Sequence, residues 1–333
     1  MKKKIIILII SLFMIGSIIF IFVRKNNNLL SNEGNSKMKL ERTGWAESIP
    51  PSFKNKAKNQ GKLEKVSYDT LDYTNNKKIK KEAVVYLPYD YDESKEYNIF
   101  YLMHGWTGHA GDFFEYSKIV NILDNMIENK EIEPLIVVAA TFDSENVGQS
   151  WERSVEELEP FHLDFENALM PYIESHYSTY AKSTSKEDLI SSREHRAFGG
   201  FSLGGVTTWW MFKYDLDYIK YFLPMSGDAW YVTTFGGLYY PKETVDEIEK
   251  VVKNNDRDYF IAAYLGTRDA RYDQVNNQMV EMLKRGTFNN SFVYYQVKDA
   301  YHDMNATDID IYNGLKLLFK KKGKSQWFPF IIL

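Results

Sequence analysis

The sequence of 333 residues contains no cysteine. Disulfide bonds, thiolate metal sites and a lipid-modified cysteine anchor are therefore excluded. The sequence also lacks a His-Glu-x-x-His motif, a clustered carboxylate loop and a phosphate-cradling glycine pattern. Common metal and nucleotide sites are recognised by those motifs. We therefore expect no required metal and no nucleotide cofactor.

Basic residues are outnumbered by acidic residues outside the N-terminal segment. The first 25 residues hold five lysines and arginines and no acidic residue. Removing those five from the 41 basic residues of the chain leaves 36 against 45 acidic residues, a net charge of −9. A negatively charged body is repelled by phosphate backbones. We therefore expect no nucleic-acid partner.

The N-terminal segment is dominated by an apolar run. Three lysines precede residues 5–23, which are almost uninterruptedly apolar. The apolar region of a signal peptide is usually shorter and ends at a small-x-small cleavage site, whereas this run has nearly the length of a bilayer span. We predict an uncleaved signal-anchor over residues 1–25, with a cleaved signal peptide as the alternative. Either one places the rest of the chain outside the cytoplasm, membrane-anchored or secreted.

The remainder divides into a tether and one domain. Residues 26–43 are rich in Asn, Ser, Gly and Lys and show no apolar periodicity, which is typical of a flexible tether. Residues 44–333 are assigned to a single catalytic domain, because α/β domains of this length are common. Its first two predicted strands, 62–73 and 80–87, alternate polar and apolar residues on either side of a turn near Asn75.

From residue 98 onward, short apolar strands alternate with longer helical segments. This order predicts a mostly parallel sheet with helices on both faces, as in an α/β-hydrolase fold. The other expected strands are 98–103, 135–141, a strand leading into residue 200, 221–225, 259–265 and 292–297. The expected helices are 111–129, 158–177 (interrupted by Pro160 and Pro171), 242–254, 272–285 and 305–321.

The segment Gly200-Phe201-Ser202-Leu203-Gly204 joins a short apolar strand to a helix-compatible run. Gly-x-Ser-x-Gly in this context predicts a nucleophile elbow with Ser202 at its apex. The strained turn brings strand and helix close together, so glycines are needed two positions before and after the serine.

Two further residues occupy the positions that the fold reserves for an acid and a base. In an α/β hydrolase the acid commonly follows the second strand after the nucleophile, and the histidine follows the last strand. Asp269 lies in the first position and His302 in the second. Asp228, which follows the strand immediately after the elbow, is a rival acid. We predict the triad Ser202, Asp269 and His302, with Asp228 as the alternative to Asp269.

The segment His104-Gly105-Trp106 directly follows a predicted strand, where an oxyanion-hole loop belongs. The hole requires two backbone N–H groups about 3 Å from the developing negative charge, one from this loop and one after the nucleophile. The amides of Trp106 and Leu203 are the predicted donors.

The chain has seven tryptophans and 24 tyrosines, more than a core demands, so some rings are expected to face a ligand. Trp106, Trp151 and Trp230 lie near the predicted catalytic loops and could stack on a phenolic or sugar ring. Asp228 and Trp230 follow a parallel strand at the sheet edge where ligands bind. Trp151, Asp228 and Trp230 are therefore the predicted substrate-binding residues.

Several longer motifs carry a family pattern. They are Tyr86-Leu87-Pro88, Leu102-Met103-His104-Gly105-Trp106, Arg196-Ala197-Phe198-Gly199-Gly200-Phe201-Ser202-Leu203-Gly204-Gly205, Leu223-Pro224-Met225-Ser226-Gly227-Asp228 and His302-Asp303. Together they resemble the feruloyl esterase domains that are joined to xylanases, within the wider group of esterase-D-like carboxylesterases. The resemblance implies the triad Ser202, Asp269 and His302. It also implies hydroxycinnamoyl or acetyl esters of plant xylan as substrates.

The resulting hypothesis is an extracytoplasmic serine carboxylesterase that hydrolyses feruloyl or acetyl esters, with a carbohydrate-linked ester as its partner and a membrane contact through its N-terminus. Siderophore esterases, mycolyltransferases and S-formylglutathione hydrolases share the fold, so an esterase or acyltransferase acting on another ester is one alternative. A non-catalytic, membrane-tethered binding protein on the same scaffold is another. A glycosidase with paired carboxylates would leave the serine, aspartate and histidine positions unexplained.

Overall fold

The computed structural model describes residues 46, 48–145 and 150–319. The predicted signal-anchor (residues 1–25) and tether (26–43) lie outside the described residues. Within the described ranges, no helix has both the length and the apolar character needed to cross a membrane. Contacts group Gly44–Trp327 into one compact unit.

An eight-stranded sheet in the order β1-β2-β4-β3-β5-β6-β7-β8 runs through this unit. Antiparallel pairing joins β1 to β2 and β2 to β4, and the remaining neighbours are parallel. The prediction of a mostly parallel sheet is therefore confirmed. The strands are β1 (Lys62–Asp72), β2 (Lys77–Leu87), β3 (Asn98–Met103), β4 (Leu135–Ala140), β5 (Arg196–Phe201), β6 (Tyr221–Met225), β7 (Phe260–Gly266) and β8 (Phe292–Val297).

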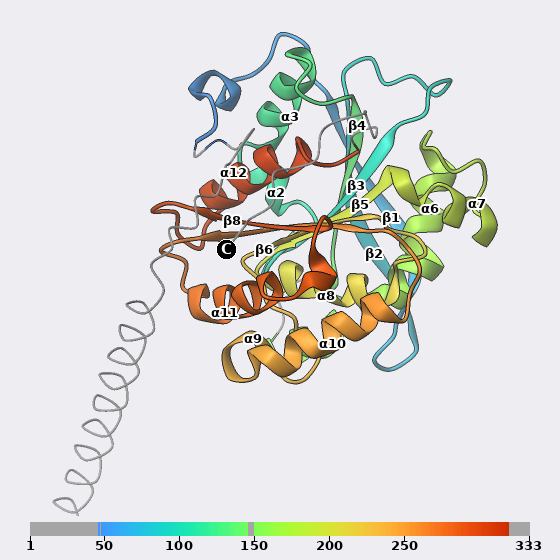
Figure 1. Cartoon of the computed structure of the whole chain (residues 1–333). Coiled ribbons are helices and arrows are strands. Elements are labelled where there is room, and N and C mark those ends of the chain that lie inside the picture. The colour runs from blue at the N-terminus through green and yellow to red at the C-terminus, as the bar shows by residue number, and fades with distance from the viewer. Residues whose placement is uncertain (1–45, 47, 146–149, 320–333) are drawn as a thin grey trace, which may run out of the picture. The chain divides into compact units, whose positions relative to one another are not determined.

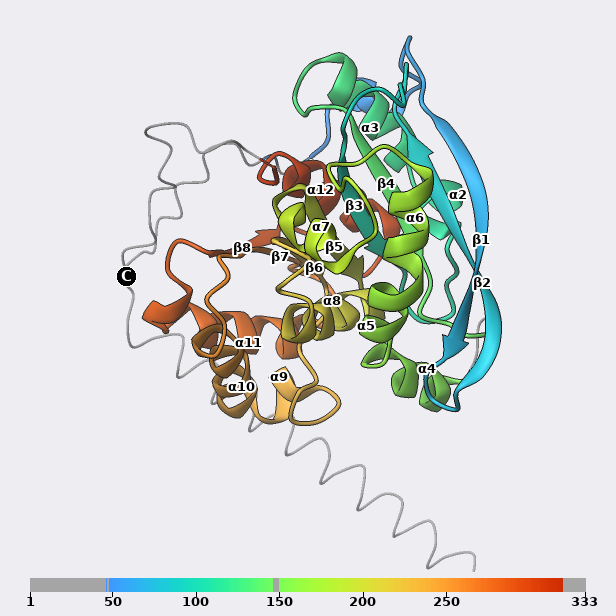
Figure 2. The same ribbon diagram turned by 90° about the vertical axis from the view of Figure 1, so that its right-hand side faces the viewer.

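Helices cover both faces of the sheet, as Figures 1 and 2 show: α3 and α12 lie on one face, and α8, α10 and α11 on the other. Strands covered on both faces are apolar along their whole length, and every residue of β4 and β5 is buried. The helices are α2 (Asp112–Tyr116), α3 (Ile119–Glu128), α4 (Trp151–Leu158), α5 (Phe161–Asp164), the π-helix η2 (Phe165–Leu169), α6 (Met170–His176), α7 (Lys186–Ser191), α8 (Leu203–Tyr214), α9 (Gly236–Tyr239), α10 (Pro241–Lys253), α11 (Tyr272–Leu283) and α12 (Met304–Leu315).

Two predicted helices are built differently from expectation. The helix expected over 111–129 is two helices, because the Ser117 hydroxyl donates to the Phe113 carbonyl and accepts from the Ile119 amide, which ends α2 and starts α3. The helix expected over 158–177 is a succession of α5, η2 and α6. Pro171 lies in the first turn of α6, where a missing N–H costs little, so it does not end the helical path. Helices α4, α7 and α9 were not predicted.

The parallel strands carry the predicted catalytic residues to one edge. Because β3, β5, β6, β7 and β8 run in the same direction, the segments that follow them meet at the same end of the sheet. Ser202 follows β5 directly, Asp269 follows β7, and His302 follows β8. This edge is where the candidate site must lie.

Candidate active site

Ser202 stands at a strained turn between β5 and α8. Its φ of 59° and ψ of −114° lie outside the regions that a residue with a β-carbon prefers. Two backbone hydrogen bonds hold the turn: the Ser202 amide donates to the Met225 carbonyl at 3.0 Å, and the Ser202 carbonyl accepts from the Val206 amide at 3.1 Å. The serine is therefore fixed at the carboxyl end of β5 and the start of α8.

The glycines around Ser202 permit contacts that a side chain would block. A β-carbon on Gly200 would lie 2.5 Å from the carbonyl carbon of Gly204, and one on Gly204 would overlap the carbonyl oxygen of Met103 at the end of β3. The same approach brings the next loop to the serine, because a β-carbon on Gly105 would lie 3.2 Å from that of Ser202. The Gly-x-Ser-x-Gly spacing thus reflects packing of β3 and β5 against the start of α8.

His302 and Asp269 form a hydrogen-bonded pair. His302 Nδ1 lies 2.9 Å from each carboxylate oxygen of Asp269, and the Arg271 amide donates to Oδ1 at 2.6 Å. Burial raises the pKa of Asp269, but the hydrogen bond and charge of His302 and the Arg271 amide outweigh it and hold that pKa below its ordinary value. An ionised carboxylate only accepts, so Nδ1 carries the hydrogen, and Nε2 of the neutral ring is left as an acceptor.

The ring of His302 lies beside the elbow. Its centroid is 4.4 Å from that of Phe201, the residue that precedes Ser202. The structure thus places the His302–Asp269 pair beside the residue that precedes Ser202, although the three residues come from segments separated by up to 100 residues of sequence.

Asp228 has different partners from those predicted. Its side chain is fully buried, and it accepts hydrogen bonds from the Gly237 amide at 2.9 Å, Trp230 Nε1 at 3.1 Å and the Arg271 guanidinium at 3.4 Å. Burial raises the pKa of Asp228 above its ordinary value, although the Arg271 charge opposes this. Asp228 is therefore neither the partner of His302 nor exposed to a substrate. It anchors the segment that carries Trp230.

The loop after β3 is held by a buried histidine. Nδ1 of His104 lies 2.7 Å from the Gly105 carbonyl oxygen, and Nε2 lies 2.7 Å from the Thr141 hydroxyl. A carbonyl only accepts, so Nδ1 donates to Gly105 and Nε2 accepts from Thr141. Burial lowers the pKa of His104 to about 4, so the ring is neutral near pH 7. This fixes the peptide group between Gly105 and Trp106, whose N–H is one of the predicted oxyanion donors.

This arrangement predicts a pH dependence of stability. Between the unfolded pKa of 6.5 and the folded pKa of about 4, the unfolded chain binds a proton at His104 that the folded chain excludes. The free energy of unfolding should therefore fall as the pH drops from 6.5 to 4, by on the order of 3 kcal/mol from this residue. Urea titrations of the wild type and His104→Gln across this range test it. Equal pH slopes for the two proteins would contradict the assignment.

Aromatic rings form a wall over the neighbouring loops. Trp151 lies between Trp106, at a centroid distance of 5.4 Å, and Phe235, on which it stacks at 6.0 Å. Trp230 packs against both Trp151 and Phe235, and the Arg271 guanidinium covers Trp230 and Phe235 at 5.7 and 5.4 Å. Trp106 is 46% exposed and Trp230 only 5%, so the accessible part of this wall is Trp106 together with the partly buried Trp151 and Phe235.

Sequence reasoning missed Phe235 and Arg271. Phe235 lies in a stretch of small and aromatic residues without a recognisable motif, and only its φ of 59° marks it as special. Arg271 follows the predicted acid by two residues, which was the one available signal that it belongs to the site.

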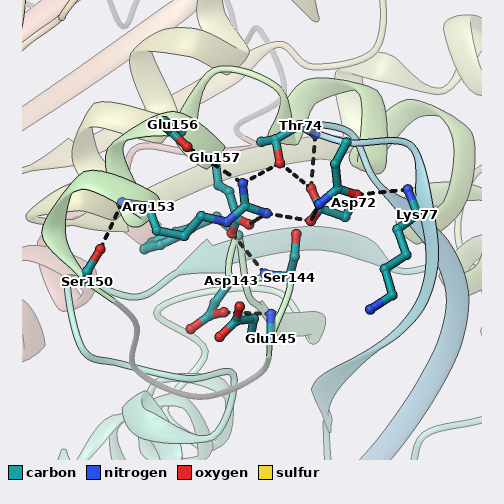
Figure 3. Close-up of polar contacts among 12 residues, drawn as sticks. Asp72, Thr74, Lys77, Asp143, Ser144, Glu145, Ser150, Arg153, Glu156 and Glu157 are labelled. Carbon is teal, nitrogen blue, oxygen red and sulfur yellow. Dashed lines mark hydrogen bonds and ion pairs between the residues drawn. The ribbon is translucent and has the colours of Figure 1, made fainter.

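Helix α4, which begins with Trp151, is fixed to the rest of the molecule by Arg153 (Figure 3). The guanidinium binds Asp72 and Thr74 at the β1–β2 turn and pairs with Glu157 at 2.7 Å. Glu157 in turn accepts from the Ser144 amide at 2.9 Å. These contacts attach the helix that carries Trp151 to the hairpin and to the segment after β4.

The chain is similar to proteins of known sequence and known structure. A family model described as "Putative esterase" matches residues 75–309. Endo-1,4-beta-xylanase Y of Acetivibrio thermocellus is 38% identical over 251 residues, which are 74% of this chain and 21% of the relative. An endo-1,4-beta-xylanase/feruloyl esterase of Xylanibacter ruminicola is 29% identical over 213 residues, 62% of this chain and 25% of the relative. The chain therefore spans only a quarter or less of these two curated relatives.

A solved structure covers the fold more completely. A serine-to-alanine mutant of the feruloyl esterase module from Clostridium thermocellum, complexed with sinapinate, superposes with a TM-score of 0.73 at 34% identity. The match covers 84% of this chain and 95% of that module. The similarity thus extends over nearly the whole of that module.

Proposed function

Because the chain belongs to this esterase family and is a feruloyl-esterase-like hydrolase, we propose that it is a serine carboxylesterase acting on hydroxycinnamoyl esters of plant cell-wall polysaccharide. The observation that carries the proposal is the hydrogen-bonded pair of Asp269 and His302, in which the imidazole ring of His302 packs against Phe201, the residue before Ser202. An acid, a base and a hydroxyl in this order are the parts that acyl transfer requires.

The proposed reaction begins with proton transfer. Nε2 of His302 accepts the hydroxyl proton of Ser202 as Oγ attacks the carbonyl carbon of the ester, and the amides of Trp106 and Leu203 bind the developing oxyanion. Asp269 holds the ring and stabilises its positive charge. His302 then donates the proton to the departing alcohol oxygen, and the bond between that oxygen and the acyl carbon breaks. A water molecule, deprotonated by His302, hydrolyses the acyl-enzyme and regenerates Ser202.

The choice of a hydroxycinnamoyl acyl group is supported by the aromatic wall. Trp106 and Trp151 offer ring surface beside the oxyanion loop, which suits a planar phenolic group and which an acetyl group would not need. The module complexed with sinapinate, itself a hydroxycinnamate, is 34% identical to this chain. Acetyl, siderophore and other small esters are the competing substrates.

A substrate panel with a matched pair of variants tests this proposal. The chain should hydrolyse methyl ferulate with a higher kcat/KM than 4-nitrophenyl acetate, acetylated xylan or a siderophore ester. Trp151→Ala should lower kcat/KM for methyl ferulate about tenfold, because it removes one aromatic contact with the acyl group. It should leave the hydrolysis of aryl acetates nearly unchanged, because an acetyl group does not make this contact. Trp151→Phe, which keeps a ring, should retain most of the preference. Tyr89→Ala, at an exposed ring beyond β2, is the control. A preference for the siderophore ester, or equal losses on all substrates in Trp151→Ala, would reject the acyl assignment.

We also propose that this activity faces the outside of the cell. The lysines before the apolar run of residues 5–23 support that orientation. Intact cells that express the chain should then hydrolyse an impermeant feruloyl ester as fast as their lysate does. Activity in the lysate alone would place the domain in the cytoplasm.

A further inference from the structure

A second group of chemistry-bearing residues lies at the opposite end of the helix that follows Ser202. Asp215 follows the last residue of α8 as its C-cap, and α5 packs beside this helix in Figure 2. With 12 residues in α8 and a rise of 1.5 Å per residue, the two ends are about 18 Å apart. This group therefore does not belong to the candidate active site.

His162, Glu166 and Asp215 converge there. One potential ligand atom from each residue lies within 4.8 Å of the others, and no other such group occurs among the described residues. Nδ1 of His162 is 3.1 Å from Oε1 of Glu166. Two ligands about 2.1 Å from a tetrahedral ion are about 3.4 Å apart, so the two hydrogen-bonded atoms need to separate only slightly to share an ion. The His162 ring is stacked on Tyr214 at 4.1 Å, which fixes its plane.

The carboxylate of Asp215 accepts no hydrogen bond from the described residues. Its side chain is fully buried, and both carboxylate oxygens lack a hydrogen-bond donor within the part of the chain that the structure describes. A buried carboxylate in this state requires a cation or a proton. Burial, the neighbouring charge of Glu166 and a hydrogen bond to Glu166 raise the pKa of Asp215, so a proton shared by the two carboxyl groups is the alternative to a cation. Asp310 is equally buried and unpartnered, but it belongs to no group of three potential metal ligands among the described residues.

The backbone around Glu166 also favours a binding site, because it includes a π-helix. Glu166 belongs to the π-helix η2, which continues α5 without a break and places Glu166 one turn after His162. Single π-turns inside helices occur frequently at functional sites. The third ligand comes from a different helix, so an ion here would link the α5–η2 segment to the end of α8.

We propose that His162, Glu166 and Asp215 bind one divalent transition-metal ion of the zinc class, and that this ion stabilises the fold. One imidazole nitrogen and two carboxylate oxygens suit zinc, whereas magnesium and calcium prefer all-oxygen sites. A charge of +2 balances the two carboxylates, and water can fill the remaining position. The ion has no part in the ester chemistry proposed above, so the two proposals stand or fall separately.

Zinc titration of the full chain tests the proposal. The tag-free protein, purified in detergent and stripped with a chelator, is titrated with zinc chloride at pH 7.5 by calorimetry, and bound zinc is counted by elemental analysis. We expect one saturable site in the wild type. The variants Asp215→Asn and Glu166→Gln should each weaken it by about tenfold or more. The control His176→Gln removes a histidine that is likewise stacked on a tyrosine, at 4.2 Å, and should bind as the wild type does.

Thermal unfolding gives a second readout. Saturating zinc should raise the unfolding midpoint of the wild type and of His176→Gln and leave that of Asp215→Asn unchanged, because only a site present in the folded state stabilises it. Glu166, which is partly exposed, offers the same test if Asp215→Asn does not fold. Several results would overturn the proposal: no stoichiometric zinc in the wild type, unaltered zinc affinity in both variants, or equal affinity for magnesium. The first of these would mean that Asp215 and Glu166 share a proton instead.

Discussion

Ser202→Ala should lower kcat on methyl ferulate by about three orders of magnitude or more and leave the protein folded. The substitution removes only the hydroxyl oxygen that attacks the ester carbonyl. The oxyanion donors are backbone amides and stay in place, so some catalysis above the rate in water should remain. Steady-state kinetics on the wild type and the variant measure the loss, and a fluorophosphonate should label only the wild type.

The fold should survive because the contacts around Ser202 are made by its backbone. The turn is held by the amide and carbonyl of this residue, and alanine has the same β-carbon. Ser192→Ala is a matched control, since Ser192 is a buried serine just before the opposite end of β5. It should lose stability but not activity. Retained hydrolysis by Ser202→Ala would refute the nucleophile assignment.

Asp269→Asn should lower kcat by about three to four orders of magnitude with little change of shape. An amide in place of the carboxylate can donate a hydrogen to Nδ1 of His302, which would put the ring hydrogen on Nε2, where a base is needed. The variant also loses the negative charge that stabilises the imidazolium in the transition state. Turnover on methyl ferulate at saturating substrate measures the effect.

The same substitution at the rival acid separates catalysis from stability. Asp228→Asn leaves the buried Arg271 guanidinium without its ion pair, so we expect a lower unfolding midpoint and a decrease in kcat of less than about tenfold in the folded fraction. The two substitutions should therefore have opposite effects: Asp269→Asn mainly lowers kcat, and Asp228→Asn mainly lowers the unfolding midpoint. A larger loss of kcat in Asp228→Asn than in Asp269→Asn would reverse the assignment of the acid.

The apolar strands whose bounds were predicted agree with the structure to within one residue at each end. The predictions 98–103, 221–225 and 292–297 match β3, β6 and β8 residue for residue, because apolar runs there are bounded by polar or turn residues. The sequence position of Asp269 and His302 relative to their strands also places them correctly at one edge, since parallel strands bring their carboxyl ends together.

Features that depend on side-chain partners were not predictable. The split between α2 and α3 depends on one serine hydroxyl, and the burial of Asp228 depends on Arg271, which is 43 residues away. The group of His162, Glu166 and Asp215 joins two segments with no common motif. The local sequence pattern does not show which distant side chains will meet, because tertiary packing determines these contacts.

Arg271 connects recognition of the acyl group to the chemistry of the ester bond. Its amide holds the carboxylate of Asp269, while its guanidinium covers Trp230 and Phe235 and pairs with Asp228. A change of Trp230 or Phe235 that makes room for a bulkier acyl group will therefore also disturb the residue that orients the acid. On this inner side of the wall, an altered acyl preference will come with an altered turnover number, whereas Trp151 does not contact Arg271 through its ring and can change the preference alone.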